Sequence, residues 1–151
     1  ESIPAKLLLV GDGPERQNVE KLTRQVCMED DVYFLGKQEA VEELLAIADL
    51  FVLPSETESF GLAALEAMAC EVPVISTNTG GIPEINVQGV TGYLSNVGDV
   101  DDMAANAIKI LSDESTLLQF RKNAIAQANK FSLDSILPMY EAYYRKVIEQ
   151  K

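Results

Sequence analysis

Histidine and tryptophan are absent from the 151-residue sequence, and cysteine occurs only twice. Zinc sites in proteins are built mainly from cysteine and histidine, and Cys27 and Cys70 lack the spacing of paired metal ligands. No metal site is therefore expected. The two cysteines are expected to be free thiols in a reducing compartment, which predicts a cytoplasmic protein.

Basic residues are scarce as well, because 12 Lys and Arg face 24 Asp and Glu, for a formal net charge of −12. A surface of this charge repels nucleic-acid backbones and anionic membranes, so neither is an expected partner. The sequence shows no apolar run that would span a membrane and no signal peptide. A bound nucleotide is not excluded, because a few backbone N–H groups can hold one pair of phosphates.

Apolar residues make up 47% of the sequence, which is enough for a chain of this length to bury a core. We therefore expect one domain over residues 1–151. The first residues lead directly into an apolar strand, so we expect this domain to be truncated at its N-terminal side.

Short apolar runs alternate with helical patterns along the chain. Strands are predicted at residues 6–10, 32–35, 50–53, 72–76 and, after a hairpin-like turn, within 89–94. Helices are predicted at residues 14–26, 41–48, 61–70, 103–111, 117–128 and 132–149, with a short helix near Pro83. This alternation predicts an open, doubly wound α/β fold, a Rossmann-like parallel sheet covered by helices on both faces.

Glu66 is the only charged residue in the predicted helix at 61–70, whose other residues are Gly, Ala, Leu, Met and Cys. A helix that is apolar on all sides is expected to be buried. Glu66 is then expected to need a partner instead of lying in solvent as a surface carboxylate. From the residues alone, a structural and a functional role for Glu66 are equally compatible with this pattern.

Glu58 lies eight residues before Glu66, in a polar loop that leads into the same helix. Ser59 is the expected N-cap. The backbone N–H groups of Phe60, Gly61 and Leu62 would then be free and would point out of the helix start. The helix dipole favours an anion such as phosphate at this place. Taken alone, Glu58 fits an exposed loop residue better than a site residue.

Glycine turns follow the first two predicted strands. Gly11 and Gly13 form the first turn, which lacks the third glycine of a dinucleotide fingerprint because Arg16 occupies that position. A Rossmann dehydrogenase is therefore disfavoured. Ligands bind at the carboxyl ends of the strands in this fold class, where both turns are expected, although ordinary structural turns are the alternative. The second turn consists of Gly36, Lys37 and Gln38.

The Glu-x7-Glu spacing, with Ser-Phe-Gly in between, resembles the signature of retaining glycosyltransferases of the GT-B fold, in family 4, which use nucleotide sugars. The Gly-x-Gly-Pro, Leu-Gly-Lys-Gln and Gly-Gly-Ile-Pro-Glu segments resemble the same family. This resemblance implies a C-terminal, donor-binding domain without its first strand. It also implies that the acceptor domain and the basic residues that bind the diphosphate lie outside this chain, so that the chain alone is inactive.

The resemblance further assigns roles to individual residues. It implies that Glu66 binds the ribose hydroxyls and that Glu58 is the catalytic carboxylate that contacts the donor sugar. Backbone N–H groups would hold the diphosphate, and no metal or other cofactor would be needed. The remaining donor-binding residues would be Ser59, Phe60, Gly61, Leu62, Gly11, Gly13, Gly36, Lys37 and Gln38.

Within the family, the motifs are most similar to those of the bacillithiol branch. This similarity implies UDP-N-acetylglucosamine as donor and L-malate as a small acceptor, with transfer of the hexosyl group under retention. Two other classes stay open. A retaining glycosidase also uses two carboxylates, and a non-catalytic α/β interaction or nucleotide-binding module would use neither.

Three further expectations concern structure. The Gly-Gly-Ile-Pro-Glu segment is expected to be mainly structural. The family resemblance implies glycine at position 71, in a left-handed helix end, so Glu71 is expected to strain that end slightly. Pro138 is expected near the first turn of the last helix. The apolar stripe of that helix is broader than one domain needs, so it is expected to stay exposed unless a partner, such as a second copy of the chain, covers Tyr140, Tyr143 and Val147.

Overall fold

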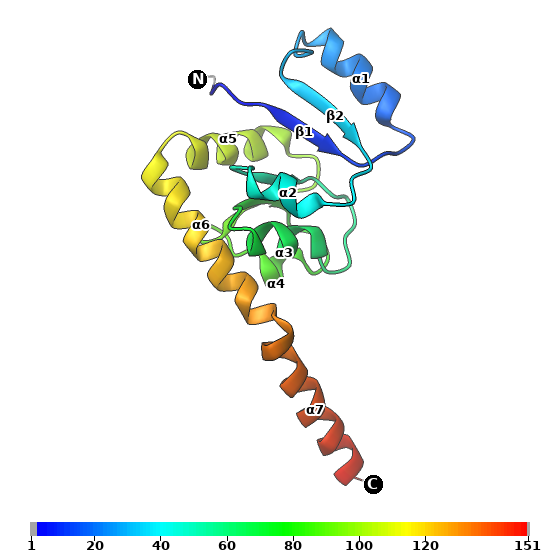
Figure 1. The fold of residues 1–151 in the computed structure, drawn as a ribbon, viewed down its shortest axis with the longest axis vertical. Coiled ribbons are helices and arrows are strands. Elements are labelled where there is room, and N and C mark those ends of the chain that lie inside the picture. The colour runs from blue at the N-terminus through cyan, green and yellow to red at the C-terminus, as the bar shows by residue number, and fades with distance from the viewer. Residues whose placement is uncertain (1–2, 151) are drawn as a thin grey trace. The chain divides into compact units, whose positions relative to one another are not determined.

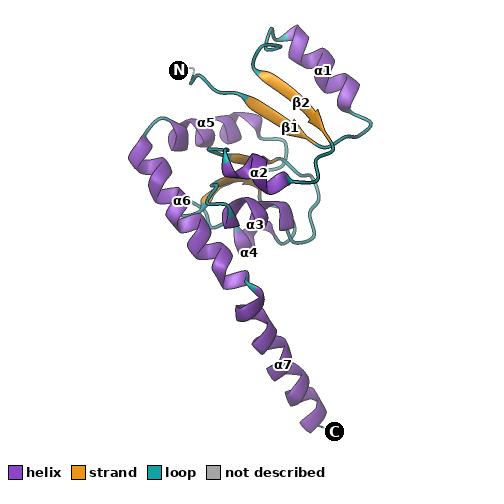
Figure 2. Cartoon of the chain, in the orientation of Figure 1, coloured by secondary structure: helices purple, strands orange, loops and turns teal. Residues whose placement is uncertain are grey.

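The structure is a computed structural model that describes residues 3–150. The chain divides into two compact units, of which the first ends at Val41 and the second begins at Glu42. Strands alternate with helices along the chain (Figure 1), and helices account for most of its second half (Figure 2). This alternation confirms the predicted α/β class.

The first unit contains a two-stranded parallel sheet and one helix. Strand β1 (Leu7–Val10) pairs with β2 (Val32–Gly36), and α1 (Arg16–Gln25) connects them. The helix begins at Arg16, because Glu15 is its N-cap residue. The helix therefore begins two residues later than the predicted helix at residues 14–26, and Pro14, the first residue of that prediction, lies in the preceding turn.

The second unit contains a three-stranded parallel sheet in the order β3-β4-β5. These strands are β3 (Phe51–Leu53), β4 (Val74–Thr77) and β5 (Gly92–Ser95). The boundary between the units falls at the start of the next helix in the chain after β2. The helices are α2 (Val41–Ala46), α3 (Leu62–Ala69), α4 (Ile82–Ile85), α5 (Val100–Leu111), α6 (Glu114–Ala128), the 3-10 helix η1 (Asn129–Phe131) and α7 (Leu133–Glu149).

The core of the second unit forms around β4, whose four residues are all buried. Ile75 of this strand packs with Met103 and Ile110 of α5 and with Phe120 of α6. Tyr93 of β5 stacks on Phe120 with 5.5 Å between the ring centroids. All of β4 is buried, its polar residues Ser76 and Thr77 included, as expected for a strand inside a parallel sheet.

Both sheets are open and parallel, as the sequence predicts. β1 and β2 form one of them, and β3, β4 and β5 form the other. That a further strand completes the fold beside β1 stays a prediction, and so does the expectation of a single domain over residues 1–151.

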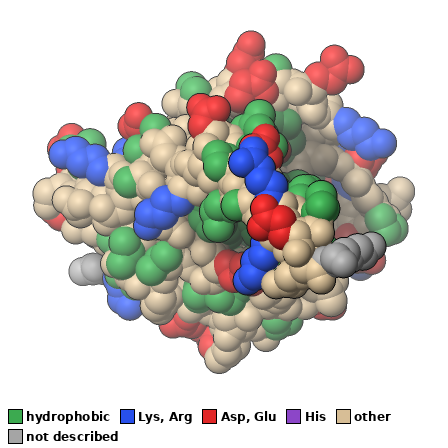
Figure 3. Space-filling view, turned by 90° about the horizontal axis from the view of Figure 1, so that it is seen from below, with side chains coloured by type: hydrophobic (Ala, Val, Ile, Leu, Met, Phe, Trp, Pro, Cys, Tyr) green, Lys and Arg blue, Asp and Glu red, His purple; other side chains and the backbone are tan. Residues whose placement is uncertain are grey.

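Helix α7 carries the apolar stripe that the sequence predicts. Tyr140, Tyr143 and Val147 are 57%, 64% and 43% exposed, which confirms their expected exposure. Figure 3 shows apolar side chains beside acidic and basic ones on the face of the molecule that is seen from below. What covers this stripe, including a second copy of the chain, stays a prediction.

Pro138 lies inside α7 and not in its first turn, so that expectation is wrong. Proline lacks a backbone N–H, and the carbonyl of Asp134 therefore loses its helical donor. This carbonyl belongs to the exposed beginning of the helix, where water can replace the missing donor.

Among the helices described between residues 3 and 150, none has the length and apolarity to cross a membrane.

Helix α3 ends in a Schellman motif centred on Glu71. The backbone N–H of Val72 donates to the carbonyl of Ala67 at 2.9 Å, and the N–H of Glu71 donates to the carbonyl of Met68 at 3.1 Å. Glu71 has a φ of 63°, in the left-handed region. The predicted left-handed helix end is therefore confirmed. The side chain of Glu71 makes this backbone conformation sterically unfavourable.

We expect Glu71→Gly to stabilise the second unit by about 1 kcal/mol, because glycine adopts a left-handed φ without steric cost. Urea denaturation followed by far-UV circular dichroism measures the change. The control is Glu114→Gly, in the first turn of α6, where glycine should lower the free energy of unfolding. A loss of stability in both variants would contradict the strain at Glu71.

Candidate functional site

The loop between β3 and α3 brings the predicted acidic residue Glu58 to the start of a helix. Gly61 is the N-cap residue of α3 and has a φ of 91°. A Cβ at this position would lie 3.0 Å from Cδ1 of Ile85 and 3.3 Å from Cγ1 of Ile82. Glycine is therefore needed at Gly61 both for the backbone angle and for close packing on α4.

The start of α3 presents backbone N–H groups without protein acceptors. Within residues 3–150, no protein group accepts a hydrogen bond from the N–H of Phe60, Gly61 or Leu62. The helix dipole adds positive potential at the same place. The arrangement is suited to an anion, and the predicted binding of phosphate by these three groups stays a prediction.

Ser59 does not cap the helix, so the predicted N-cap is wrong. The side chain of Ser59 makes no capping hydrogen bond, and Gly61 is the N-cap residue instead. The left-handed backbone at Gly61 turns the chain before α3 begins, which makes the helix start two residues later than a Ser59 cap requires. The N–H groups are consequently left uncapped by any side chain of the described chain.

The Glu58 side chain is half-buried and lies close to this helix start. Its carboxylate accepts a hydrogen bond from the N–H of Ser59 at 3.0 Å, and its Cγ lies 3.9 Å from the Cβ position of Gly61. In the described part of the chain, no Lys or Arg forms an ion pair with Glu58 or Glu66. The Glu58 carboxylate therefore remains available to other donors, such as hydroxyl groups.

Glu66 is exposed, which corrects the expectation of a buried carboxylate. Helix α3 buries Ala64, Ala67 and Met68 but exposes its opposite side, where Leu62 is 63% exposed. Because the helix is apolar all round, its sequence does not indicate which side faces the core. Burial alone therefore gives no reason for Glu66 to have a partner.

A pocket of about 310 Å³ lies along the exposed side of α3 and includes Glu66. Apolar residues of α3 form one wall, and the junction between α6 and α7 forms the other. Phe131 in this junction meets Phe60 edge-to-face, with 5.9 Å between the ring centroids. The pocket thus joins the Glu66 carboxylate to the helix start. Its lining residues are Leu62, Leu65, Glu66, Ala69, Ala128, Asn129, Phe131 and Ser132.

The loop between β3 and α3, residues 54–61, is called the acidic loop below. A second segment, Thr77–Gly81, forms hydrogen bonds to this loop, and we call it the bracing segment. The Thr77 hydroxyl donates to the carbonyl of Ser55 at 2.6 Å, and the Thr79 hydroxyl donates to the carbonyl of Glu56 at 3.3 Å. The N–H of Gly81 donates to the carbonyl of Ser59 at 3.1 Å. These bonds support the interpretation of the Gly-Gly-Ile-Pro-Glu segment as structural.

The first unit brings its two predicted glycine turns together. The N–H of Gly11 donates to the carbonyl of Gly36 at 2.7 Å, and the N–H of Gly13 bonds to the Asp12 carboxylate at 3.0 Å. Lys37 is exposed. The Gln38 side chain donates to the carbonyl of Leu35 at 2.7 Å, within its own turn. A donor-binding role of these turns stays a prediction.

Arg16 lies beside the second glycine turn and its neighbouring strand. Its guanidinium is 5.9 Å from the centre of the Phe34 ring, and one terminal nitrogen lies 3.8 Å from the Cβ position of Gly36. Its Nε also pairs with Glu20 at 2.9 Å. The residue that takes the place of a third glycine therefore packs against β2.

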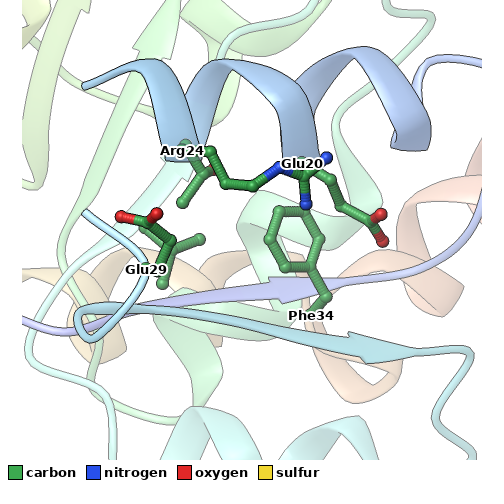
Figure 4. A pocket seen from close by; sticks show the side chains of 6 residues that line it. Glu20, Arg24, Glu29 and Phe34 are labelled. Atoms are coloured by element: carbon green, nitrogen blue, oxygen red, sulfur yellow. The ribbon is translucent and has the colours of Figure 1, made fainter. Parts of the chain in front are cut away.

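A smaller pocket of about 210 Å³ lies between α1 and β2 in the first unit. Figure 4 shows Glu20 and Arg24 extending from α1, with Phe34 on the strand and Glu29 to one side. None of the predicted site residues lines this pocket. It is a gap between a helix and a strand and has no assigned chemistry.

Sequence reasoning missed the hydroxyl groups of the bracing segment. Thr77 and Thr79 lie at the carboxyl end of β4, which is the position where side chains of this fold class meet ligands or loops. These hydroxyl residues could have indicated a contact with a neighbouring loop from the sequence alone. Its hydrogen-bonding partners in the acidic loop were not evident from the sequence.

Comparison with known sequences identifies a protein family whose model matches most of this chain. A model of the family described as glycosyl transferases group 1 matches residues 1–127. The N-acetyl-alpha-D-glucosaminyl L-malate synthase of Bacillus anthracis is 48% identical, over 97% of this chain and 39% of the relative. The 2-deoxystreptamine N-acetyl-D-glucosaminyltransferase of Niallia circulans is 33% identical, over 92% of this chain and 36% of the relative. The chain thus spans well under half the length of these two relatives.

Solved structures show the same fold. HepE of Anabaena, in complex with UDP, matches with a TM-score of 0.86 at 28% identity, over 94% of this chain and 41% of that chain. Sucrose-phosphate synthase from Thermosynechococcus elongatus matches with a TM-score of 0.85 at 31% identity, over 97% of this chain and 39% of that chain. Both similarities confirm the predicted α/β fold class.

Gly80→Ala tests how closely the bracing segment approaches the acidic loop. A Cβ at Gly80, whose φ is 56°, would lie 1.6 Å from the carbonyl oxygen of Glu58. We expect a loss of more than about 3 kcal/mol in the free energy of unfolding, because the two backbones must separate. Chemical denaturation measures this loss.

Gly89→Ala is the matched control, because Gly89 has a φ of 70° but no atom within 4 Å of its Cβ position. Its expected cost is only that of a left-handed alanine, about 1 kcal/mol. Equal losses in the two variants would show that the approach at Gly80 is not tight.

Proposed function

Since the chain belongs to the glycosyl transferases group 1 family, we propose that its second unit binds a nucleotide-sugar donor at the start of α3. The observation that carries this proposal is the set of three acceptor-free N–H groups at Phe60, Gly61 and Leu62, beside the Glu58 carboxylate. The family supplies the chemical class of the ligand, and the helix start supplies groups that match a diphosphate.

The proposed roles divide the donor among these groups. The N–H groups hold the diphosphate and stabilise the charge that develops on it as it leaves. Glu58 contacts hydroxyls of the transferred sugar, and Glu66 contacts the ribose hydroxyls from the rim of its pocket. A carboxylate is suited to such contacts because it accepts charge-assisted hydrogen bonds from hydroxyl groups.

The comparisons support UDP as the nucleotide, because HepE of Anabaena was solved in complex with UDP. The name of the Bacillus anthracis relative supports N-acetylglucosamine as the sugar and L-malate as the acceptor. We propose that the whole protein transfers this sugar with retention and needs no metal. We further propose that the acceptor binds outside residues 1–151, so that this chain alone transfers no sugar.

Two other functions predict different results. A retaining glycosidase would release a phenol from an aryl glycoside and would need its two carboxylates about 5 Å apart. A non-catalytic interaction module would bind no nucleotide at all. Titration of the chain with UDP, followed by NMR amide shifts, separates these alternatives. Shifts at Phe60, Gly61 and Leu62 are expected only if the proposal is correct.

We expect Glu66→Ala to weaken UDP binding by about 1–3 kcal/mol, the range for loss of hydrogen bonds to a charged group. The NMR titration gives the dissociation constant. The matched control is Glu43→Ala, which removes an exposed glutamate from α2 in the same unit. Unchanged UDP affinity in Glu66→Ala would rule out the ribose contact.

Glu58→Ala should instead affect the binding of UDP-N-acetylglucosamine and the binding of UDP differently. We expect affinity for UDP-N-acetylglucosamine to fall by about 1–3 kcal/mol while affinity for UDP changes little, because only the sugar contacts Glu58. The control variant is Glu56→Ala, an exposed glutamate two residues earlier in the loop. Equal losses for both ligands would contradict a sugar contact.

A further inference from the structure

The acidic loop has little regular structure of its own. Between the end of β3 and the start of α3 it contains no helix or strand, and its residues are mostly exposed or half-buried. The only side-chain hydrogen bond of Glu58 in the described chain is to the N–H of its own neighbour Ser59. Within residues 3–150, the Glu58 carboxylate therefore has no hydrogen bond to another segment of the chain that would fix its direction.

The backbone of this loop is held instead by the bracing segment, Thr77–Gly81. Three loop carbonyls, those of Ser55, Glu56 and Ser59, accept hydrogen bonds from it. These bonds lie on both sides of Glu58. The missing Cβ of Gly80 lets the two backbones touch at Glu58 itself.

Thr77 makes the shortest of these bonds and is the most deeply placed donor. It is 1% exposed, and its hydroxyl lies 2.6 Å from the carbonyl oxygen of Ser55. Thr77 also ends β4, the central strand of the sheet. The bond therefore connects the beginning of the loop to a strand whose four residues are all buried.

We propose that Thr77 is a positioning residue that aims the Glu58 carboxylate at the donor sugar. This inference rests on the proposed function, because it takes the contact of Glu58 with the sugar as given. Thr77 itself touches no ligand in this proposal. It acts through the backbone of residues 55–59, while the diphosphate is held by N–H groups on the other side of Glu58.

The two ligands of the proposed site should therefore respond differently to the loss of the Thr77 hydroxyl. UDP depends on the start of α3, which Gly61 holds against Ile82 and Ile85 of α4. UDP-N-acetylglucosamine depends in addition on the direction of Glu58. Loss of the bond to Ser55 should weaken the second ligand and spare the first.

The experiment is an NMR titration of the 151-residue chain with UDP and with UDP-N-acetylglucosamine, on the variants Thr77→Val and Thr77→Ser. Valine has the shape of threonine without the hydroxyl, and serine keeps the hydroxyl. We expect Thr77→Val to raise the ratio of the two dissociation constants, sugar nucleotide over UDP, by about 5- to 10-fold, as for loss of one buried hydrogen bond. Thr77→Ser should restore the ratio.

Thr23→Val is the matched control for stability, because Thr23 is also buried and donates its hydroxyl to a backbone carbonyl, that of Val19, at 2.9 Å. Thr23 lies outside the acidic loop and the bracing segment, so Thr23→Val should leave the ratio of the two dissociation constants unchanged. Thr79→Val removes the longer bond to Glu56 and should raise the ratio less than Thr77→Val does.

A double variant then tests whether Thr77 acts through Glu58. If it does, Thr77→Val combined with Glu58→Ala should show the same ratio as Glu58→Ala alone. Equal weakening of both ligands by Thr77→Val, no weakening, or an additive loss in the double variant would overturn the inference. If the wild-type chain binds neither ligand, the titration is repeated on a chain extended to include the basic residues that the family resemblance places outside residues 1–151. Failure of that extended protein to bind UDP would overturn the proposed function itself, which distinguishes the two failures.

Discussion

The close approach of two backbones, at Glu58 and Gly80, is the constraint on which the candidate site depends. Any side chain at Gly80 would occupy the space of the Glu58 carbonyl, and a Cβ at Gly81 would come within 2.7 Å of the Ser59 carbonyl. Two consecutive glycines therefore allow one loop to lie directly on the other. The start of α3 follows this loop, so its orientation depends on the same contact.

The site has unusual electrostatics for a place where an anion is proposed to bind. No Lys or Arg occurs between Lys37 and Lys109, although the chain carries a net charge of −12. In this stretch, backbone N–H groups and the dipole of α3 supply positive potential at the helix start without a charged side chain. Such groups are fixed in direction and do not titrate, which suits a site that is proposed to hold phosphate close to two carboxylates.

Helix α3 connects these features through its exposed side. Leu62 belongs to the helix start and to the pocket, and Glu66 follows one turn later in the same pocket. Phe131, from the junction of α6 and α7, closes the far wall and touches Phe60. Residues about 70 positions apart in the sequence therefore form one surface, with an apolar floor and a carboxylate at the rim.

The sequence alone was sufficient to predict the strands, the main helices and the α/β class. Apolar runs and helical spacing are local patterns, and the strand and helix periods can be read within a single segment. The spacing of Glu58 and Glu66 also singled out the acidic loop and α3. The left-handed helix end at Glu71 was expected from the family resemblance and not from a local pattern, and it is present in the structure.

The tertiary structure alone decided how these parts meet. The exposure of Glu66 depends on which side of an all-apolar helix packs on the sheet, and the absence of a Ser59 cap depends on the packing of Gly61 against α4. The bond from Thr77 to Ser55 joins residues 22 positions apart. Contacts of this kind are set by the packing of distant segments, which neither local propensity nor hydrophobic period encodes.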